Sequence, residues 1–216
     1  MTDVFAEVDE EVRQDQLQKL AKKWGPPILG AVVLAVAAYG GWLYWKAEQL
    51  KARVEASDAF AAALAKSSKE TPAAALAALA QVAERYEGGY RTLALLQSAA
   101  LQAEQGKREE AVALYERVSA DAAADPLLRS LGTLLSVMHQ ADSGDPAQLA
   151  AKLAPLQDDK APWRYSAREI AAVLALRAGD RARAAALYKQ LADDLAAPSG
   201  MRARAAEMTA TLAAPR

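Results

Sequence analysis

A long uncharged stretch near the start of the sequence sets the strongest limit on what this chain can fold into. No charged side chain occurs between Lys23 and Lys46, although 25% of all residues are charged. At about 1.5 Å per residue, a helix over residues 26–45 measures roughly 30 Å, the thickness of the hydrocarbon core of a bilayer. We therefore predict a transmembrane helix over residues 24–45, preceded by a tail over residues 1–23.

The residues at the two ends of the stretch suit the two membrane surfaces. Pro26 and Pro27 fit the first turn of a helix, where their missing N–H groups cost nothing. Aromatic side chains gather at both interfaces of a bilayer, and nearby lysines reach the headgroups. The sequence places such residues at Lys22, Lys23, Trp24, Trp42, Tyr44, Trp45 and Lys46.

Two other interpretations of the stretch are a buried core helix and a cleaved export signal. A core helix of a soluble protein rarely lacks charge over so many turns. An export signal begins with a short basic segment, whereas the tail here contains acidic residues at positions 3, 7, 9, 10, 11 and 15. The triplet Ala35-Val36-Ala37 resembles a cleavage site, but further apolar residues follow it. These features favour a permanent anchor.

The direction of insertion follows from the basic residues that flank the anchor. Four of them precede it closely (Arg13, Lys19, Lys22 and Lys23) and three follow it (Lys46, Lys51 and Arg53). Because cytoplasmic flanks carry the excess of Lys and Arg, this small difference favours a cytoplasmic tail and an exported C-terminal domain.

The tail has one apolar helical stripe, made of Phe5, Val8, Val12, Leu20 and Trp24. It is either a docking helix for a partner at the membrane face or a solvated extension of the anchor.

Composition predicts a helical protein without catalytic chemistry. Ala-rich segments favour helix, and no period-2 strand pattern occurs beyond residues 28–36. The chain has no Cys and a single His, His139, which lacks metal-ligand spacing and suits a structural or surface position. No phosphate-loop, dinucleotide or zinc-protease motif occurs, and the net charge of −1 argues against nucleic acid. We predict no enzyme activity, no catalytic, cofactor-binding or metal-binding residues, no cofactor and no small-molecule substrate.

The most informative pattern after the anchor is an internal repeat. GKREEAVALYERV at 106–118 aligns with GDRARAAALYKQL at 179–191, and Gly144 and Glu70 mark two weaker copies, so that the turns are spaced 36, 38 and 35 residues apart. This period is typical of helical hairpins that bury their apolar faces by stacking on one another. Repeat packing is expected from Gly106, Ala111, Tyr115, Gly179, Ala184 and Tyr188.

The order of Gly, then Ala five residues later and Tyr nine later, resembles the tetratricopeptide repeat. The resemblance covers about residues 50–198 and is irregular. The large aromatic residue of the first helix is replaced by Leu95 and Arg168, and Leu149 and Leu153 replace Ala and Tyr in the Gly144 copy. The fold class expected is all-α, with one N-terminal transmembrane helix, a solenoid of hairpins over residues 46–198, and a capping helix over residues 199–216.

Local signals complete the expected fold. No Gly or Pro occurs between Trp42 and Glu70, so the anchor can continue as one helix into the first hairpin. Ser199 is predicted to N-cap the final helix, whose stripe covers the last hairpin. Within the membrane, Ala31, Ala35 and Ala38 form a smooth stripe that could pack on a neighbouring helix.

The resemblance also implies a binding face. In tetratricopeptide domains the first helices of successive hairpins line the concave surface. The residues that would face a partner are Leu93, Leu96, Ala100, Glu104, Ser166, Glu169, Val173 and Arg177, and several of them could instead be core residues.

The layout of the whole chain, with a tail that opens FAEVDEEVRQDQ, resembles the bacterial ancillary subunit of the Sec translocon. That family implies a single-pass inner-membrane protein with a periplasmic domain, whose partners are the translocon, a membrane-anchored periplasmic chaperone and unfolded client segments. The implied function is a non-catalytic scaffold. The alternative is an accessory subunit of another inner-membrane complex, respiratory or cell-envelope.

Overall fold

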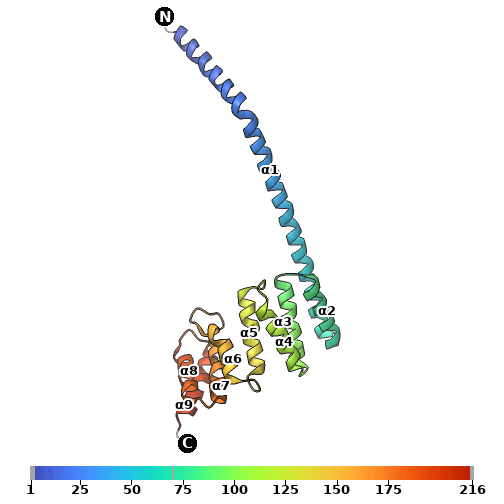
Figure 1. Cartoon of the computed structure of the whole chain (residues 1–216), viewed down its shortest axis with the longest axis vertical. Helices are drawn as coiled ribbons and strands as arrows, with labels where there is room; N and C mark the ends of the chain where they lie inside the picture. Colours follow the sequence, from blue (N-terminus) through green and yellow to red (C-terminus); the bar gives the residue numbers. More distant parts are fainter. Residues whose placement is uncertain (1–2, 70, 215–216) are drawn as a thin grey trace. The chain divides into compact units, whose positions relative to one another are not determined.

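The computed structural model describes residues 3–69 and 71–214, without the side chains of residues 3–21, 23–26, 28, 32 and 67–69. Within these residues every regular element is a helix, which confirms the predicted all-α class. The chain divides into two units, residues 1–55 and 56–216. The elements are α1 Asp3–Lys69, α2 Pro72–Arg85, α3 Gly89–Glu104, α4 Arg108–Ala120, α5 Pro126–Gln140, α6 Pro146–Leu153, the 3-10 helix η1 Ala154–Gln157, α7 Arg164–Arg177, α8 Arg181–Asp193 and α9 Ser199–Ala213 (Figure 1).

The first element, α1, is one continuous helix. Its part from Leu29 to Lys66 is long and apolar enough to cross a membrane, by length and composition. The helix already begins at Asp3, so the prediction that Pro26 and Pro27 occupy its first turn is wrong. The helix-favouring tail extends the element in the N-terminal direction, and each interior proline removes one backbone donor from it. The stripe predicted along the tail lies outside the described side chains.

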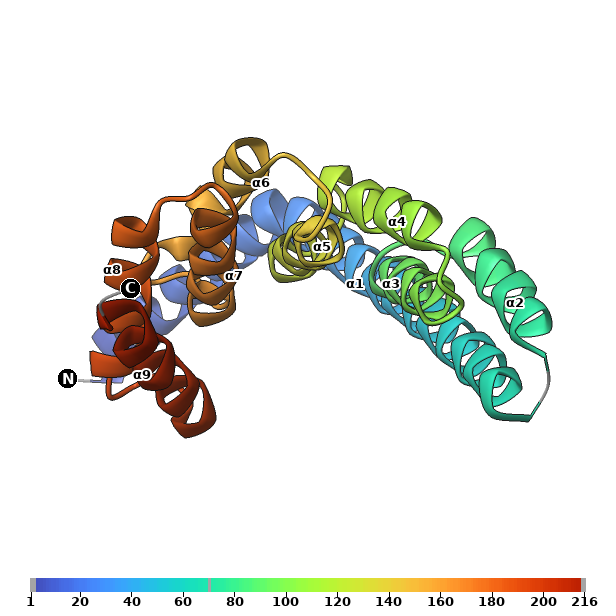
Figure 2. The ribbon, with the colours of Figure 1, turned by 90° about the horizontal axis from the view of Figure 1, so that it is seen from below.

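The second unit is built from helical hairpins, as the repeat predicts. Residues 56–69 of α1 pair with α2, and the later pairs are α3 with α4, α5 with α6, and α7 with α8. In Figure 2, α3, α5 and α7 follow one another in one layer and α2, α4, α6 and α8 in a second layer. Gly106 and Gly179 lie in the turns with φ of 76° and 78°, a backbone conformation that residues with a Cβ rarely adopt. Glu70 lies outside the described residues.

Helix starts in this unit carry recognisable caps. Asp125, Asp145 and Asp180 accept hydrogen bonds from backbone N–H groups of the following helices, at 2.8, 2.8 and 2.9 Å. Prolines occupy the first turns of α2, α5 and α6, where no backbone donor is lost. The final helix differs from the prediction: its first residue is Ser199, and Pro198 holds the N-cap position without a side-chain hydrogen bond.

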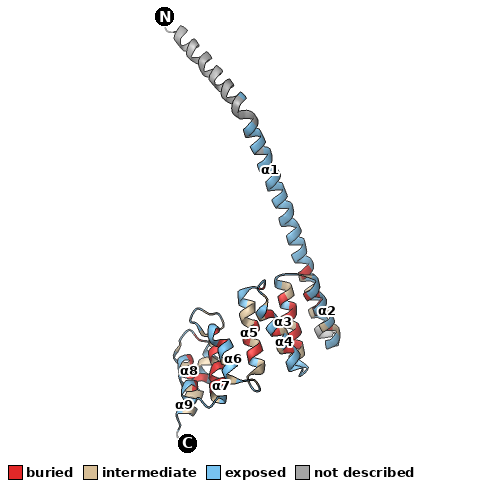
Figure 3. Ribbon diagram, viewed as in Figure 1, coloured by how far each residue is buried: buried red, intermediate tan, exposed pale blue. Residues whose placement is uncertain are grey.

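The buried core positions recur along the sequence with the same spacing as the turns. The fifth, ninth and twelfth residues after each turn position are buried in all four hairpins. Their side chains fill the space between neighbouring helices, where Figure 3 shows the buried positions. These residues are Ala75, Leu79 and Val82; Ala111, Tyr115 and Val118; Leu149, Leu153 and Leu156; and Ala184, Tyr188 and Leu191.

Two contacts join helices of neighbouring hairpins. Arg168 holds a position where the repeat would have an aromatic residue; it is 5% exposed and donates hydrogen bonds to the carbonyl of Gln157 and the carboxylate of Asp159, at 2.7 and 2.5 Å. Gly132 lets α5 approach α4 closely, since a Cβ there would lie 2.8 Å from the carbonyl oxygen of Tyr115. The Arg168 contact lies where the repeat sequence departs from its period, whereas Gly132 holds the small-residue position that Ala94 and Ala167 hold in the other copies.

Candidate protein-binding surface

Three apolar residues occupy equivalent places on successive first helices. Ala100, Met138 and Val173 each lie six residues before a turn position, namely 106, 144 and 179. Met138 is 45% exposed and Val173 is 37% exposed, whereas most apolar side chains of these helices are covered. Met138 and Val173 form, with the half-buried Ala100, a partly exposed row along α3, α5 and α7, which we call the apolar row. A row of this kind is where an array of hairpins offers a partner apolar contact.

The residues predicted on α3 fall into two groups. Leu93 and Glu104 are exposed and open to a partner, and the small Ala100 is half-buried but belongs to none of the core clusters. Leu96 is half-buried because it packs against two core clusters of the α2–α4 region. The surface of α3 is therefore smaller than the sequence pattern predicted.

The residues predicted on α7 are also divided. Ser166 is half-buried and Val173 is exposed, but the two charged residues have partners within the chain. Glu169 accepts two hydrogen bonds from Arg204 of α9, at 3.0 and 3.2 Å. Arg177 donates to the carbonyl oxygens of Ala141 and Gly144, at 2.6 and 3.0 Å. These two side chains join α7 to its neighbours and leave Val173 as the apolar contact on this helix.

The structure brings α5 into the surface, which sequence reasoning missed. Figure 2 places α5 between α3 and α7, so the α3 and α7 residues are not adjacent. The sequence pattern points to Met138 only weakly, because the Gly144 hairpin has Leu149 and Leu153 in place of the Ala and Tyr of the clearer copies. Counting six residues back from Gly144 finds it.

An aromatic pair lies under the α5 part of the surface. The rings of Tyr115 and His139 are stacked, with centroids 5.4 Å apart and an interplanar angle of 12°. Burial, and secondarily the negative charge of Glu104, raises the pKa of the Tyr115 phenol, so it remains a neutral hydroxyl. Burial and then the Arg108 charge lower the pKa of His139, which favours the neutral imidazole.

Lowering the pH below about 6.5 is expected to reduce the free energy of unfolding through His139. The unfolded chain binds this proton at a higher pH than the folded chain does, so the stabilisation is complete above the unfolded pKa and is lost as pH falls through the folded pKa. Denaturant titrations across this range should give a shallower pH dependence for His139→Phe, which keeps a ring on Tyr115. The slopes of unfolding free energy against pH should differ between the two proteins by less than the slope that one bound proton gives. Identical slopes in both proteins would contradict this role.

A polar hollow of about 320 Å³ lies where α4, α5 and α6 meet, lined by Glu116, Ser119, Thr133, Ser136 and Lys152. Lys152 donates to Glu116 at 2.7 Å, and this hydrogen bond is the main cause that lowers the pKa of the carboxyl. The hydroxyls of Ser119 and Thr133 are 2.6 Å apart. A carboxylate held ionised by a lysine is a weak proton acceptor, so this network suits a structural bridge between helices.

A second hollow of about 350 Å³ lies among α2, α3 and α4 and is lined mainly by alanine and leucine. The side-chain oxygen of Gln102 is buried here and has no hydrogen-bond partner among the described residues. No group of three or more His, Asp or Glu side chains within the described residues could hold a metal ion.

Comparison with known proteins agrees with this geometry. A family model described as a tetratricopeptide repeat-like domain matches residues 18–211. No curated protein and no solved structure matched the chain.

Proposed function

The chain belongs to the tetratricopeptide repeat-like family, and from that premise we propose that it is a membrane-anchored scaffold at the Sec translocon of a bacterial inner membrane. Domains of this family are typically non-catalytic and bind other proteins. The observation that carries the proposal is the apolar row on three successive first helices, which gives the array a place to hold a polypeptide.

The anchor is the second support. Between Leu29 and Trp45 every side chain that the structure describes is exposed, including Leu34 at 72% and Val36 at 67%. A lipid bilayer is the environment that covers such a helix on all sides. Trp42, Tyr44 and Trp45 then lie at one interface of the span over residues 24–45. Tethering in this way raises the effective concentration of the repeat unit beside other membrane proteins.

The partners proposed are the translocon, a membrane-anchored periplasmic chaperone and unfolded client segments that emerge from the translocon. Support comes from the layout of the chain and from the tail that opens FAEVDEEVRQDQ. The slight excess of basic residues before the span supports a cytoplasmic N-terminus and a periplasmic repeat unit. The residues proposed to contact partners are those of the apolar row together with Leu93, Glu104 and Ser166. The side chains of Leu96, Glu169 and Arg177 make contacts within the chain instead.

Affinity isolation of the full chain in mild detergent tests the proposal. We expect translocon subunits and a periplasmic folding factor to be recovered with it. Changing Met138 and Val173 together to Glu should reduce this recovery at least about tenfold, because buried apolar contacts at an interface contribute most of its affinity. Leu195→Glu is the matched control, since Leu195 is 84% exposed and lies outside the apolar row.

Two results would contradict the proposal. One is recovery of the chain without any translocon subunit or folding factor. The other is stoichiometric recovery with a respiratory or cell-envelope complex, which would instead support an accessory role in that assembly.

A further inference from the structure

A continuous apolar seam follows α1 from the anchor into the segment beyond it. Its residues alternate at spacings of four and three, which is the pattern of a helix that packs along a second helix. All eight positions are exposed, and the large side chains among them are between 46% and 67% exposed. The seam consists of Leu29, Val33, Val36, Gly40, Leu43, Ala47, Leu50 and Val54.

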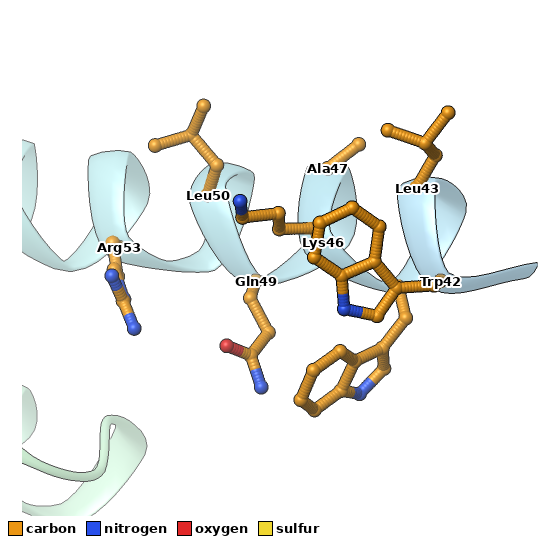
Figure 4. A pocket seen from close by; sticks show the side chains of 8 residues that line it. Trp42, Leu43, Lys46, Ala47, Gln49, Leu50 and Arg53 are labelled. Atoms are coloured by element: carbon orange, nitrogen blue, oxygen red, sulfur yellow. The ribbon is translucent and has the colours of Figure 1, made fainter. Parts of the chain in front are cut away.

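Figure 4 shows part of this seam, beside a hollow of about 440 Å³ on the surface of α1. Leu43, Ala47 and Leu50 point to the same side of the helix, while Gln49 and Arg53 point to the other. The large apolar residues between Trp45 and Val54 thus lie on one side of the helix, and the small Ala52 is on the other.

Lipid does not account for the far end of the seam. Val54 lies nine residues beyond Trp45, or about 13 Å along the helix axis. The headgroup region on each side of the hydrocarbon core is only about 5–8 Å thick. Val54 is 51% exposed, and Leu50, at the edge of that region, is 62% exposed. A seam that continues into water needs a protein surface to cover it.

The charges beside the seam indicate what kind of surface that is. In heptad terms Leu29, Val36, Leu43 and Leu50 hold d positions, and the flanking e and g positions between Trp45 and the end of the seam at Val54 are Lys46, Lys51 and Arg53. All three are basic. The next e position is Asp58, which lies beyond the seam in the repeat unit. Lys46 lies 4.6 Å from the centre of the Trp42 ring, and Lys51 is 3.7 Å from Glu48 in an exposed pair.

A second copy of this chain would fit the seam poorly. In a parallel pair of identical helices, each g residue faces the e residue of the next heptad of the partner. Within the seam this sets Lys46 against Lys51 of the other copy, and only beyond its end does Arg53 meet an acidic residue, Asp58. Basic side chains that face one another at these positions oppose pairing. Acidic side chains on the partner helix, opposite these basic residues, support it.

We infer that the seam binds a single helix of another membrane protein, parallel to α1, with apolar heptad positions and acidic side chains beside them just outside the bilayer. The inference rests on the proposed anchoring of α1. It concerns a different surface from the apolar row and names the chemistry of one partner.

A charge-reversed copy of the same chain provides the probe. We define the acid-flanked copy as the full chain with Lys46→Glu, Lys51→Glu and Arg53→Glu. The chain has no cysteine, so Glu55→Cys, at an exposed position off the seam, gives one labelling site for donor or acceptor dyes. Energy transfer is then measured between purified copies in detergent micelles.

The expected result is pairing of the unmodified chain with the acid-flanked copy at an affinity at least about tenfold higher than with itself. Leu50→Gln with Val54→Gln in the unmodified chain should remove this pairing. Ala52→Gln, on the opposite side of the helix, should leave it unchanged. Circular dichroism of each variant verifies that α1 remains helical.

Three outcomes would overturn the inference. They are equal pairing of the unmodified chain with itself and with the acid-flanked copy, no pairing in any mixture, and pairing that does not change with Leu50→Gln and Val54→Gln. Because the measurement uses purified protein, its result does not depend on recovery of translocon subunits. Failure here and failure of the proposed scaffold role are therefore distinguishable.

Discussion

Changing Leu34 and Val36 to arginine is expected to release the chain from the membrane. Both residues lie in the middle of the proposed span and are 72% and 67% exposed, so nothing in the described chain shields a charge placed there. An arginine at the centre of a span costs about 2.5–3.5 kcal/mol on insertion scales, and two together cost roughly 5–7 kcal/mol. The equilibrium should shift by more than about a thousandfold.

Extraction of membranes at alkaline pH measures the effect. The unmodified chain should remain in the pellet, and the double variant should appear in the supernatant or be degraded. Leu195→Arg adds a charge at a position that is 84% exposed in the repeat unit and should leave the chain in the pellet. An unmodified chain that is recovered in the supernatant would refute the anchor.

Tyr115→Ala is expected to lower the free energy of unfolding of the repeat unit by about 3–5 kcal/mol, the range for removal of a buried aromatic ring. Tyr115 is 2% exposed and lies between α4 and α5, where its ring stacks on His139. The close approach of the two helices at Gly132 limits how far they can move to fill the cavity. Tyr188→Ala should have a similar effect at the equivalent place in the last hairpin.

Urea denaturation followed by circular dichroism of the full chain in detergent gives this value. Tyr115→Phe is the matched control, because it keeps the ring and removes only the hydroxyl; it should cost about 1 kcal/mol or less. A change below about 1 kcal/mol for Tyr115→Ala would show that the ring does not hold the hairpins together.

The sequence predicted the hairpins well because their turns and core positions follow a regular spacing. Glycine is the residue that readily adopts a positive φ, as Gly106 and Gly179 do in the structure. A glycine in the sequence therefore identifies a turn independently of the surrounding alanines. The α5–α6 hairpin was harder to find. Its second helix ends at Leu153 and passes into η1 at Pro155, since proline interrupts helical hydrogen bonding. Leu156 nevertheless remains buried.

The helix starts were predicted less well. Pro26 and Pro27 favour a first turn locally, but the segment before them is helix-forming and α1 continues through them. Ser199 is a favourable N-cap residue, yet Pro198 takes that position in the structure. At Ser199 an N-cap preference of about 1 kcal/mol yields to the segments on either side, whereas at Pro26 and Pro27 the helix continues against a cost of about 3 kcal/mol for each interior proline.

The candidate surface could be predicted only in part, because spacing tells which side of a helix a residue occupies and not what lies opposite. Glu169 and Arg177 have the right spacing on α7, but their side chains bond to α9 and to the turn between α5 and α6. The partners lie 35 and 36 residues away in the sequence. No local pattern indicates such contacts.

The final helix, α9, limits where further hairpins could be added to the array during evolution. Ala205 of α9 is buried in a cluster with Tyr188 and Leu191, and Arg204 bonds to Glu169 of the preceding hairpin. Since each hairpin contacts only its neighbours, a duplicated hairpin could be inserted between existing ones and find matching surfaces on both sides. One added behind α9 would meet a face of alanines and polar side chains, which has among its described residues no exposed large apolar side chain to build a core. Lengthening of the array by gene duplication is therefore restricted to its interior.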